Sequence, residues 1–161
     1  MVVADVPPGL IVLLVALAAA LAFGGYRAVT DGRFRGTHRV RHAGPSAEAD
    51  RGVPADTPPV SVLADTEWSG MLGERATLLQ FSSAFCAPCR ATRRILTEVA
   101  EAVPGVTHVE VDAEHHLDLV RRVGVMRTPT TLVLDKAGVE VTRAAGAPRK
   151  DQVLQALAQV E

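Results

Sequence analysis

Two cysteines, Cys86 and Cys89, are the only ones in this chain of 161 residues, and Ala87 and Pro88 separate them. Two thiols at this spacing can exchange with a disulfide, because one thiolate attacks and the second resolves the mixed disulfide that forms. A bridge between them closes too small a loop to restrict the unfolded chain much, since the stabilisation from a disulfide grows with loop length. We therefore expect a redox centre rather than a structural crosslink.

The elements around the cysteines favour this chemistry. Residues 76–82 read as a buried strand, and Pro88 opens a helix whose apolar residues recur at the spacing of one helix face. Cys86 then lies at a helix N-terminus, where free N–H groups and the helix dipole stabilise a thiolate. We expect Cys86 to be the attacking nucleophile and Cys89, one turn on, the resolving thiol. Three nearby arginines add positive potential: Arg90, Arg93 and Arg94.

The rest of the C-terminal part alternates between the two kinds of element. A second strand is predicted over 106–112, a short helix over 117–123, strands over 130–135 and 139–144, and a final amphipathic helix over 153–160. Residues 135–138 form a turn-rich tetrad suited to a hairpin between the last two strands. This order predicts an α/β fold with a mixed central sheet flanked by helices.

Three segments resemble the thioredoxin family. Phe81-Ser-Ser-Ala-Phe-Cys-Ala-Pro-Cys89 is similar to the family's active-site segment, Gly124-Val-Met-Arg-Thr-Pro-Thr130 to its cis-proline loop, and Gly146-Ala-Pro-Arg-Lys-Asp-Gln152 to its C-terminal pattern. The resemblance covers about residues 60–161. It implies a thioredoxin fold and disulfide exchange through Cys86 and Cys89.

The resemblance also implies an active-site loop and a substrate-binding surface. It places Phe85, Ala87 and Pro88 beside the cysteines, and a cis Thr128–Pro129 peptide against them, where the Thr128 backbone pairs with an extended substrate. Phe85 stands where the family usually has Trp, and Ala87 replaces a common Gly.

A further departure concerns Gln80 and His108. Thioredoxins place a buried acid and a lysine at the matching positions, under the resolving cysteine. Because burying charges is costly, a double change to neutral types is coherent, and we expect Gln80 and His108 to form a hydrogen-bonding pair beneath Cys89. The sharper hypothesis is a proton relay in which neutral His108 accepts the Cys89 proton. The alternative is that both are core polar residues satisfied by the backbone.

The N-terminal part reads as a membrane anchor. Residues 6–26 carry no charge and are long enough, as a helix, to span a bilayer core. A cleaved signal peptide would begin with a positive region, but the only charged side chain before this run is Asp5. A buried soluble helix would not be apolar on all sides. We expect a tail (1–5), one transmembrane helix (6–26), a basic juxtamembrane segment and linker (27–59), and a thioredoxin-like domain (60–161).

Charge predicts the orientation of this anchor. Five arginines follow the apolar run and none precedes it: Arg27, Arg33, Arg35, Arg39 and Arg41. The arginine-rich flank of a first transmembrane helix is usually cytoplasmic, so we expect a single-pass protein of the cell membrane whose catalytic domain faces the cytoplasm. A basic juxtamembrane stretch also gains from anionic lipid headgroups. The net charge of -1 argues against a nucleic-acid partner.

The sequence thus predicts a protein-disulfide reductase without cofactor or bound metal. Its partners would be protein disulfide substrates, the membrane and an unidentified upstream reductant. Three alternatives stay open. A CxxC metal module would need more ligands, such as His115 or His116. A redox-inert scaffolding domain would keep only the fold. An extracytoplasmic thiol oxidoreductase for protein or cytochrome maturation would share the chemistry, since the couples of the compartment decide the direction.

Overall fold

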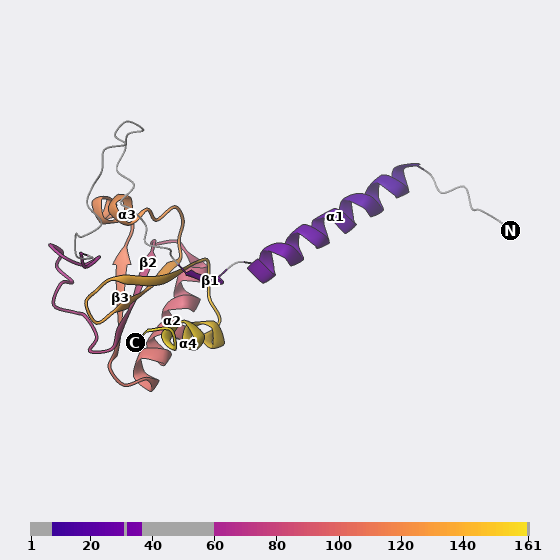
Figure 1. The fold of residues 1–161 in the computed structure, drawn as a ribbon. Helices are drawn as coiled ribbons and strands as arrows, with labels where there is room; N and C mark the ends of the chain where they lie inside the picture. Colours follow the sequence, from indigo (N-terminus) through magenta and orange to yellow (C-terminus); the bar gives the residue numbers. More distant parts are fainter. Residues whose placement is uncertain (1–7, 31, 37–59, 161) are drawn as a thin grey trace, which may run out of the picture. The chain divides into compact units, whose positions relative to one another are not determined.

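The apolar run predicted as a buried strand is β2 (Ala76–Ser82), and all seven of its residues are buried. The computed structural model describes residues 8–30, 32–36 and 60–160. In it, β2 pairs in parallel with β3 (Val106–Asp112) and antiparallel with β4 (Thr130–Asp135), which pairs antiparallel with β5 (Glu140–Ala145). The sheet order is β1-β5-β4-β2-β3, so the predicted mixed sheet is confirmed (Figure 1).

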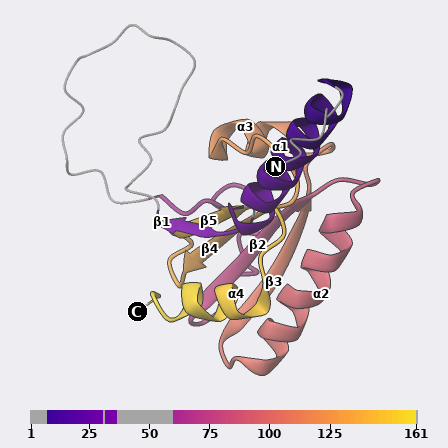
Figure 2. The ribbon, with the colours of Figure 1, turned by 90° about the vertical axis from the view of Figure 1, so that its right-hand side faces the viewer.

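Helices cover both faces of this sheet. On one face α2 (Ala87–Ala102) and α4 (Lys150–Leu157) lie side by side, and their apolar residues pack with Leu78 and Val133 (Figure 2). On the other face α3 (Leu117–Val123) and the segment 62–72 pack against Phe81. Because alternate strand residues point to opposite faces, each buried strand contributes to both cores.

The strand at the edge next to β5 differs from the sequence prediction. β1 (Phe34–Gly36) lies inside the segment 27–59 that the sequence assigns to a linker, and it pairs antiparallel with β5. Phe34 packs against the core of the α2 and α4 face. Just before β1, the Gly32 N–H donates to the Ala145 carbonyl over 3.1 Å. Three residues are too few to show a strand period, so this strand left no signal in the sequence.

In the N-terminal unit, residues 1–31, the structure describes the helix α1 (Pro8–Thr30). The stretch Gly9–Arg27 has a mean hydropathy of 2.3, and by length and composition it can cross a membrane. A helix of 19 residues is about 28 Å long, close to the ~30 Å of a bilayer hydrocarbon core. Of the helix that the sequence predicts over 6–26, residues 8–26 lie in α1, which extends by one turn to Thr30; residues 6 and 7 lie outside the described residues.

Candidate functional site

The two cysteines form a disulfide at the N-terminus of α2. Their Cα atoms are 5.2 Å apart. Cys86 is the N-cap residue, and its sulfur accepts a hydrogen bond of 3.1 Å from the Cys89 N–H. Pro88 sits in the first turn, where a missing N–H leaves no bond unmade. Cys86 is partly exposed whereas Cys89 is 2% exposed, so an external disulfide would meet Cys86 first.

The helix N-terminus gives this position its electrostatic character. The first N–H groups of a helix lack backbone partners four residues earlier, and they carry the positive end of the helix dipole. Here the Cys89 N–H points to the Cys86 sulfur itself. A thiolate formed at Cys86 on reduction would meet this donor without rearrangement of the helix. Leu96 and Val99, both fully buried, hold α2 on the sheet and so fix the direction of its N-terminus.

The loop before β4 lies against the segment that leads into Cys86. The peptide between Thr128 and Pro129 is cis, which confirms the isomer implied by the resemblance. The Thr128 and Ser83 hydroxyls are 3.1 Å apart and hydrogen-bonded, and the Cys86 N–H donates to the Ser83 carbonyl over 3.3 Å. Pro129 is buried, and its carbonyl accepts from the Gly146 N–H over 2.8 Å. The fold thus joins two loops that are distant in sequence.

Two large apolar side chains next to these loops are almost fully exposed. Phe85, directly before Cys86, is 97% exposed, and Met126, two residues before Thr128, is 92% exposed. Ala87 and Pro88 are exposed as well. Apolar side chains that protrude to this degree beside a reactive centre offer contact area to a partner. The sequence predicts this role for Phe85 and misses Met126, although Met126 lies within the segment that resembles the cis-proline loop.

Gln80 and His108 meet beneath the buried cysteine. Gln80 is fully buried, its Nε2 donates to the Cys89 carbonyl over 3.0 Å, and its Oε1 lies 3.2 Å from His108 Nε2. Since the amide nitrogen faces Cys89, the amide oxygen faces the imidazole, and His108 Nε2 must carry the hydrogen. His108 Nδ1 then accepts from the Thr97 hydroxyl at 3.1 Å. The expected hydrogen-bonding pair is present, while its part in proton transfer stays a prediction.

A carboxylate that sequence reasoning missed lies next to this pair. Glu110 Oε1 accepts from Ser82 Oγ over 2.6 Å and from an Arg93 nitrogen over 2.8 Å. Burial would raise the pKa of the Glu110 carboxyl, but the hydrogen bonds from Arg93 and Ser82 outweigh it and hold that pKa below its usual value. The Arg93 charge is therefore paired, so it adds less potential at the cysteines than the sequence suggests.

The same surroundings keep His108 neutral. Burial lowers the pKa of His108 below its usual value of 6.5; Glu110 opposes this effect and Arg93 adds to it. A carboxylate paired with a guanidinium is a weak base, whereas a neutral imidazole near its pKa is an effective one. His108 is thus the better proton acceptor of the two. In the sequence, His108 is noticeable because it occupies the position of the family's lysine. Glu110 lies two residues further along β3, on the same side of the strand.

His115 and His116, the ligands of the alternative metal site, have other partners. His115 Nδ1 is 3.0 Å from Asp112, His116 Nε2 is 3.7 Å from Glu67, and the His116 ring packs edge-on to Trp68. Glu67, Trp68 and the two histidines line an open hollow of about 390 Å³. Among residues 8–30, 32–36 and 60–160, no three His, Cys, Asp or Glu side chains are grouped so that they could hold a metal ion.

Comparisons with known proteins agree with this geometry. The family model described as Thioredoxin matches residues 59–159. A thioredoxin from Alicyclobacillus acidocaldarius is 34% identical over 55% of this chain and 84% of its own length. One from Chlamydia trachomatis is 28% identical over 59% of this chain and 92% of its own. A solved thioredoxin variant from Halobacterium salinarum superposes with a TM-score of 0.51 over 55% of this chain and 77% of its own, at 20% identity, and shows the shared fold.

Proposed function

The chain belongs to the thioredoxin family of thiol–disulfide oxidoreductases, and from that premise we propose that it reduces protein disulfides by dithiol exchange through Cys86 and Cys89. The observation that carries the proposal is the cysteine pair at the start of α2, with one residue accessible and the other buried. A pair that differs in exposure suits a reaction in two steps, because the first thiol must reach a substrate protein whereas the second must attack only the mixed disulfide on the first.

In the first step the Cys86 thiolate attacks one sulfur of the substrate disulfide. A bond forms between Cys86 and that sulfur, the substrate disulfide breaks, and the other substrate sulfur leaves as a thiolate that takes a proton from solvent. The helix N-terminus stabilises the attacking thiolate. Phe85 and Met126 offer apolar contacts to the substrate. The backbone of Thr128 would pair with an extended substrate strand, and Ala87 and Pro88 lie beside its path.

In the second step the Cys89 sulfur attacks Cys86. The mixed disulfide breaks, the second substrate thiol is released, and the Cys86–Cys89 disulfide forms, so that the dithiol has given two electrons to the substrate. An upstream thiol reductant must then restore the dithiol. Cys89 has to lose its proton in this step, and we propose His108, held by Gln80, as the acceptor. The support is that Gln80 bonds to both the Cys89 backbone carbonyl and the His108 imidazole, so a neutral imidazole lies close beneath this cysteine.

We place this activity at a membrane surface. The support is the apolar stretch Gly9–Arg27, whose length matches a bilayer core. The five arginines after it favour a cytoplasmic position for the catalytic unit, where thiol reductants keep dithiols reduced. This position favours reduction over oxidation as the direction of exchange.

Single-cysteine variants test the proposed order of attack. We expect Cys89→Ser to accumulate a mixed disulfide with a substrate protein, because the first step proceeds and the second cannot. Cys86→Ser should form none and should lose disulfide reduction altogether. Non-reducing electrophoresis after incubation with a disulfide-containing protein separates the two results. Mixed disulfides formed by Cys86→Ser and not by Cys89→Ser would reverse the assignment.

A further inference from the structure

The chain enters the catalytic unit much closer to α1 than the sequence suggests. α1 ends at Thr30, and Gly32 already belongs to the catalytic unit, bonded to the Ala145 carbonyl. Residues 37–59 therefore follow β1 and connect two parts of the same unit. They do not stand between α1 and the sheet, so they cannot act as a spacer from a membrane.

Chain length limits how far Gly32 can be from the apolar span. The span ends at Arg27, three further helical residues and two peptide links lead to Gly32, and together they reach at most about 12 Å. This limit holds whatever the angle between the two units. The headgroup layer on each side of a bilayer is roughly 5–7 Å thick. Gly32 is thus held at, or just outside, the headgroups of any membrane that α1 crosses.

The point of attachment lies at the active-site end of the sheet. Ala145, which bonds to Gly32, also accepts from the Arg127 guanidinium over 2.6 Å and is the register partner of Thr130. The next residue, Gly146, bonds to the Pro129 carbonyl. From Pro129 the contacts continue through Thr128 and Ser83 to Cys86, so the redox centre and the attachment point lie at the same end of the sheet.

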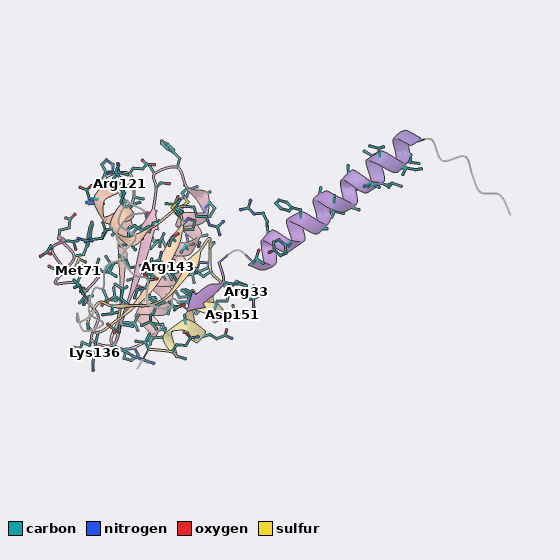
Figure 3. The ribbon with its side chains drawn as sticks, turned by 45° about the horizontal axis from the view of Figure 1, so that its top comes forward. Arg33, Met71, Arg121, Lys136, Arg143 and Asp151 are labelled. Atoms are coloured by element: carbon teal, nitrogen blue, oxygen red, sulfur yellow. A yellow bond between two sulfur atoms is a disulfide. The ribbon has the colours of Figure 1, made fainter. Side chains whose placement is uncertain are left out.

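The exposed residue beside Gly32 is consistent with this arrangement. Arg33 extends from the sheet edge on the side of Asp151 of α4, and Figure 3 shows the two residues on the same side of the unit. An exposed cation that follows so closely on an apolar span gains from anionic headgroups. Arg33 would therefore draw the β1 edge of the sheet toward a bilayer with anionic headgroups.

We propose, on the basis of the function given above, that the protein partner of Cys86 and Cys89 is an integral membrane protein whose own cysteine pair lies at the bilayer surface. A tether of one residue keeps Gly32 at the headgroups, so the redox centre stays within the reach of one small domain from the membrane and its effective concentration toward groups at that surface rises. Soluble proteins gain nothing from such a tether. The exposed Phe85 and Met126 would contact the membrane-proximal part of this partner.

Reporters of two heights test the proposal. Each consists of residues 1–31 of this chain followed by a disulfide-bonded cysteine pair, placed either three residues after the anchor or beyond a 30-residue Gly/Ser stalk, which adds about 30 Å on average. Both are reconstituted in vesicles with the pre-reduced full-length chain, and the single-turnover rate of reporter reduction is measured. We expect the short reporter to react faster by about threefold or more. Equal rates, or a faster long reporter, would overturn the proposal and favour a soluble partner.

Spacer variants of the full chain test whether the short connection after α1 causes the preference for the short reporter. A 20-residue Gly/Ser spacer between residues 31 and 32 should abolish the preference for the short reporter, because it lets the unit move about 25 Å from the bilayer. The same spacer between residues 47 and 48 should keep the preference, and loss of it there would count against the tether. All variants should reduce a soluble disulfide peptide equally well. Failure of that control in the unmodified chain would instead contradict the proposed reductase function.

Discussion

The imidazole of His108 is fixed in one tautomer by its neighbours. The Gln80 amide donates to the Cys89 carbonyl and accepts from His108 Nε2, so the lone pair of the imidazole is on Nδ1, where it accepts from the Thr97 hydroxyl. With the disulfide formed, the Cys89 sulfur carries no proton, and the Gln80 side chain lies between the Cys89 backbone and the His108 ring. The Cys89 carbonyl can only accept a hydrogen bond, so the Gln80 amide keeps this orientation as long as that bond is made.

The first residue-scale prediction concerns His108→Ala. We expect the second step, in which Cys89 resolves the mixed disulfide, to slow by about 10–100-fold, as loss of a positioned base does in general. Attack by Cys86 should be unchanged. Because burial lowers the pKa of His108, the neutral base persists somewhat below pH 6.5, and the wild-type rate should fall only at lower pH. Rapid-mixing measurements of both steps from pH 5 to 9 check this.

The shape of the pH profile separates a base from a packing residue. Without the imidazole the inflection on the acid side should disappear, and the rate should follow ionisation of the Cys89 thiol alone. Thr97→Val is the matched control, because it removes the hydrogen bond to Nδ1 and leaves the ring in place. Its resolution rate should stay near that of the wild type. An unaltered profile in His108→Ala would leave this histidine with a packing role only.

The prediction at the scale of elements concerns strand β4, where the hydroxyls of two neighbouring threonines differ in their hydrogen bonds. The hydroxyl of Thr131 is buried without a hydrogen-bond partner, whereas the hydroxyl of Thr130 donates to the Arg127 carbonyl over 2.8 Å. A buried unsatisfied hydroxyl costs roughly 1–3 kcal/mol, and valine has the same shape and suits a strand. We expect Thr131→Val to raise the free energy of unfolding by about 1 kcal/mol. Urea denaturation of the full-length chain in detergent measures it.

Thr130→Val serves as the matched control on the same strand. It breaks a satisfied hydrogen bond and leaves the Arg127 carbonyl without that donor, so it should lower the free energy of unfolding by about 1 kcal/mol. If Thr131→Val were as destabilising as Thr130→Val, the Thr131 hydroxyl would have a partner such as a buried water. The same strand begins at the cis-proline loop, so the pair also reports how firmly β4 holds that loop.

The sequence predicts the strands β2, β3 and β4 best, since all three begin and end at the predicted residues. β2 and β4 are almost wholly buried runs, whereas β3 combines buried valines with partly exposed polar residues. The redox role of the cysteine pair followed from its spacing, and the cis peptide at Pro129 from the resemblance to the thioredoxin family. β1 did not, because its three residues owe their conformation to pairing with β5, which is more than a hundred residues away. Glu110 was missed for a similar reason, since its partners come from β2 and α2.

At the scale of the whole molecule, the missed strand changes the architecture more than its length suggests. A chain with a long linker would let its redox centre search a wide volume, whereas a chain that enters the catalytic unit two residues after its apolar helix cannot. Hydropathy identifies the helix and motif spacing identifies the redox centre. The short connection between them depends on the pairing of β1 with β5, and only the three-dimensional structure shows it.

The last prediction concerns the side of the membrane. Five arginines lie between residues 27 and 41 and none precedes the apolar helix, so the C-terminal flank should remain in the cytoplasm during insertion. A reporter enzyme that works only outside the cytoplasm, fused after Glu161, should therefore be inactive, and one that works only inside should be active. Replacing Arg27, Arg33 and Arg35 with glutamine while adding three lysines before the helix should reverse both signals, since the bias in positive charge then favours the other orientation. Because the catalytic unit joins the helix through a single residue, its side of the membrane is also the side of its partner's cysteines. Activity of the external reporter on the unmodified chain would place exchange outside the cytoplasm, and would favour maturation of extracytoplasmic proteins over cytoplasmic reduction.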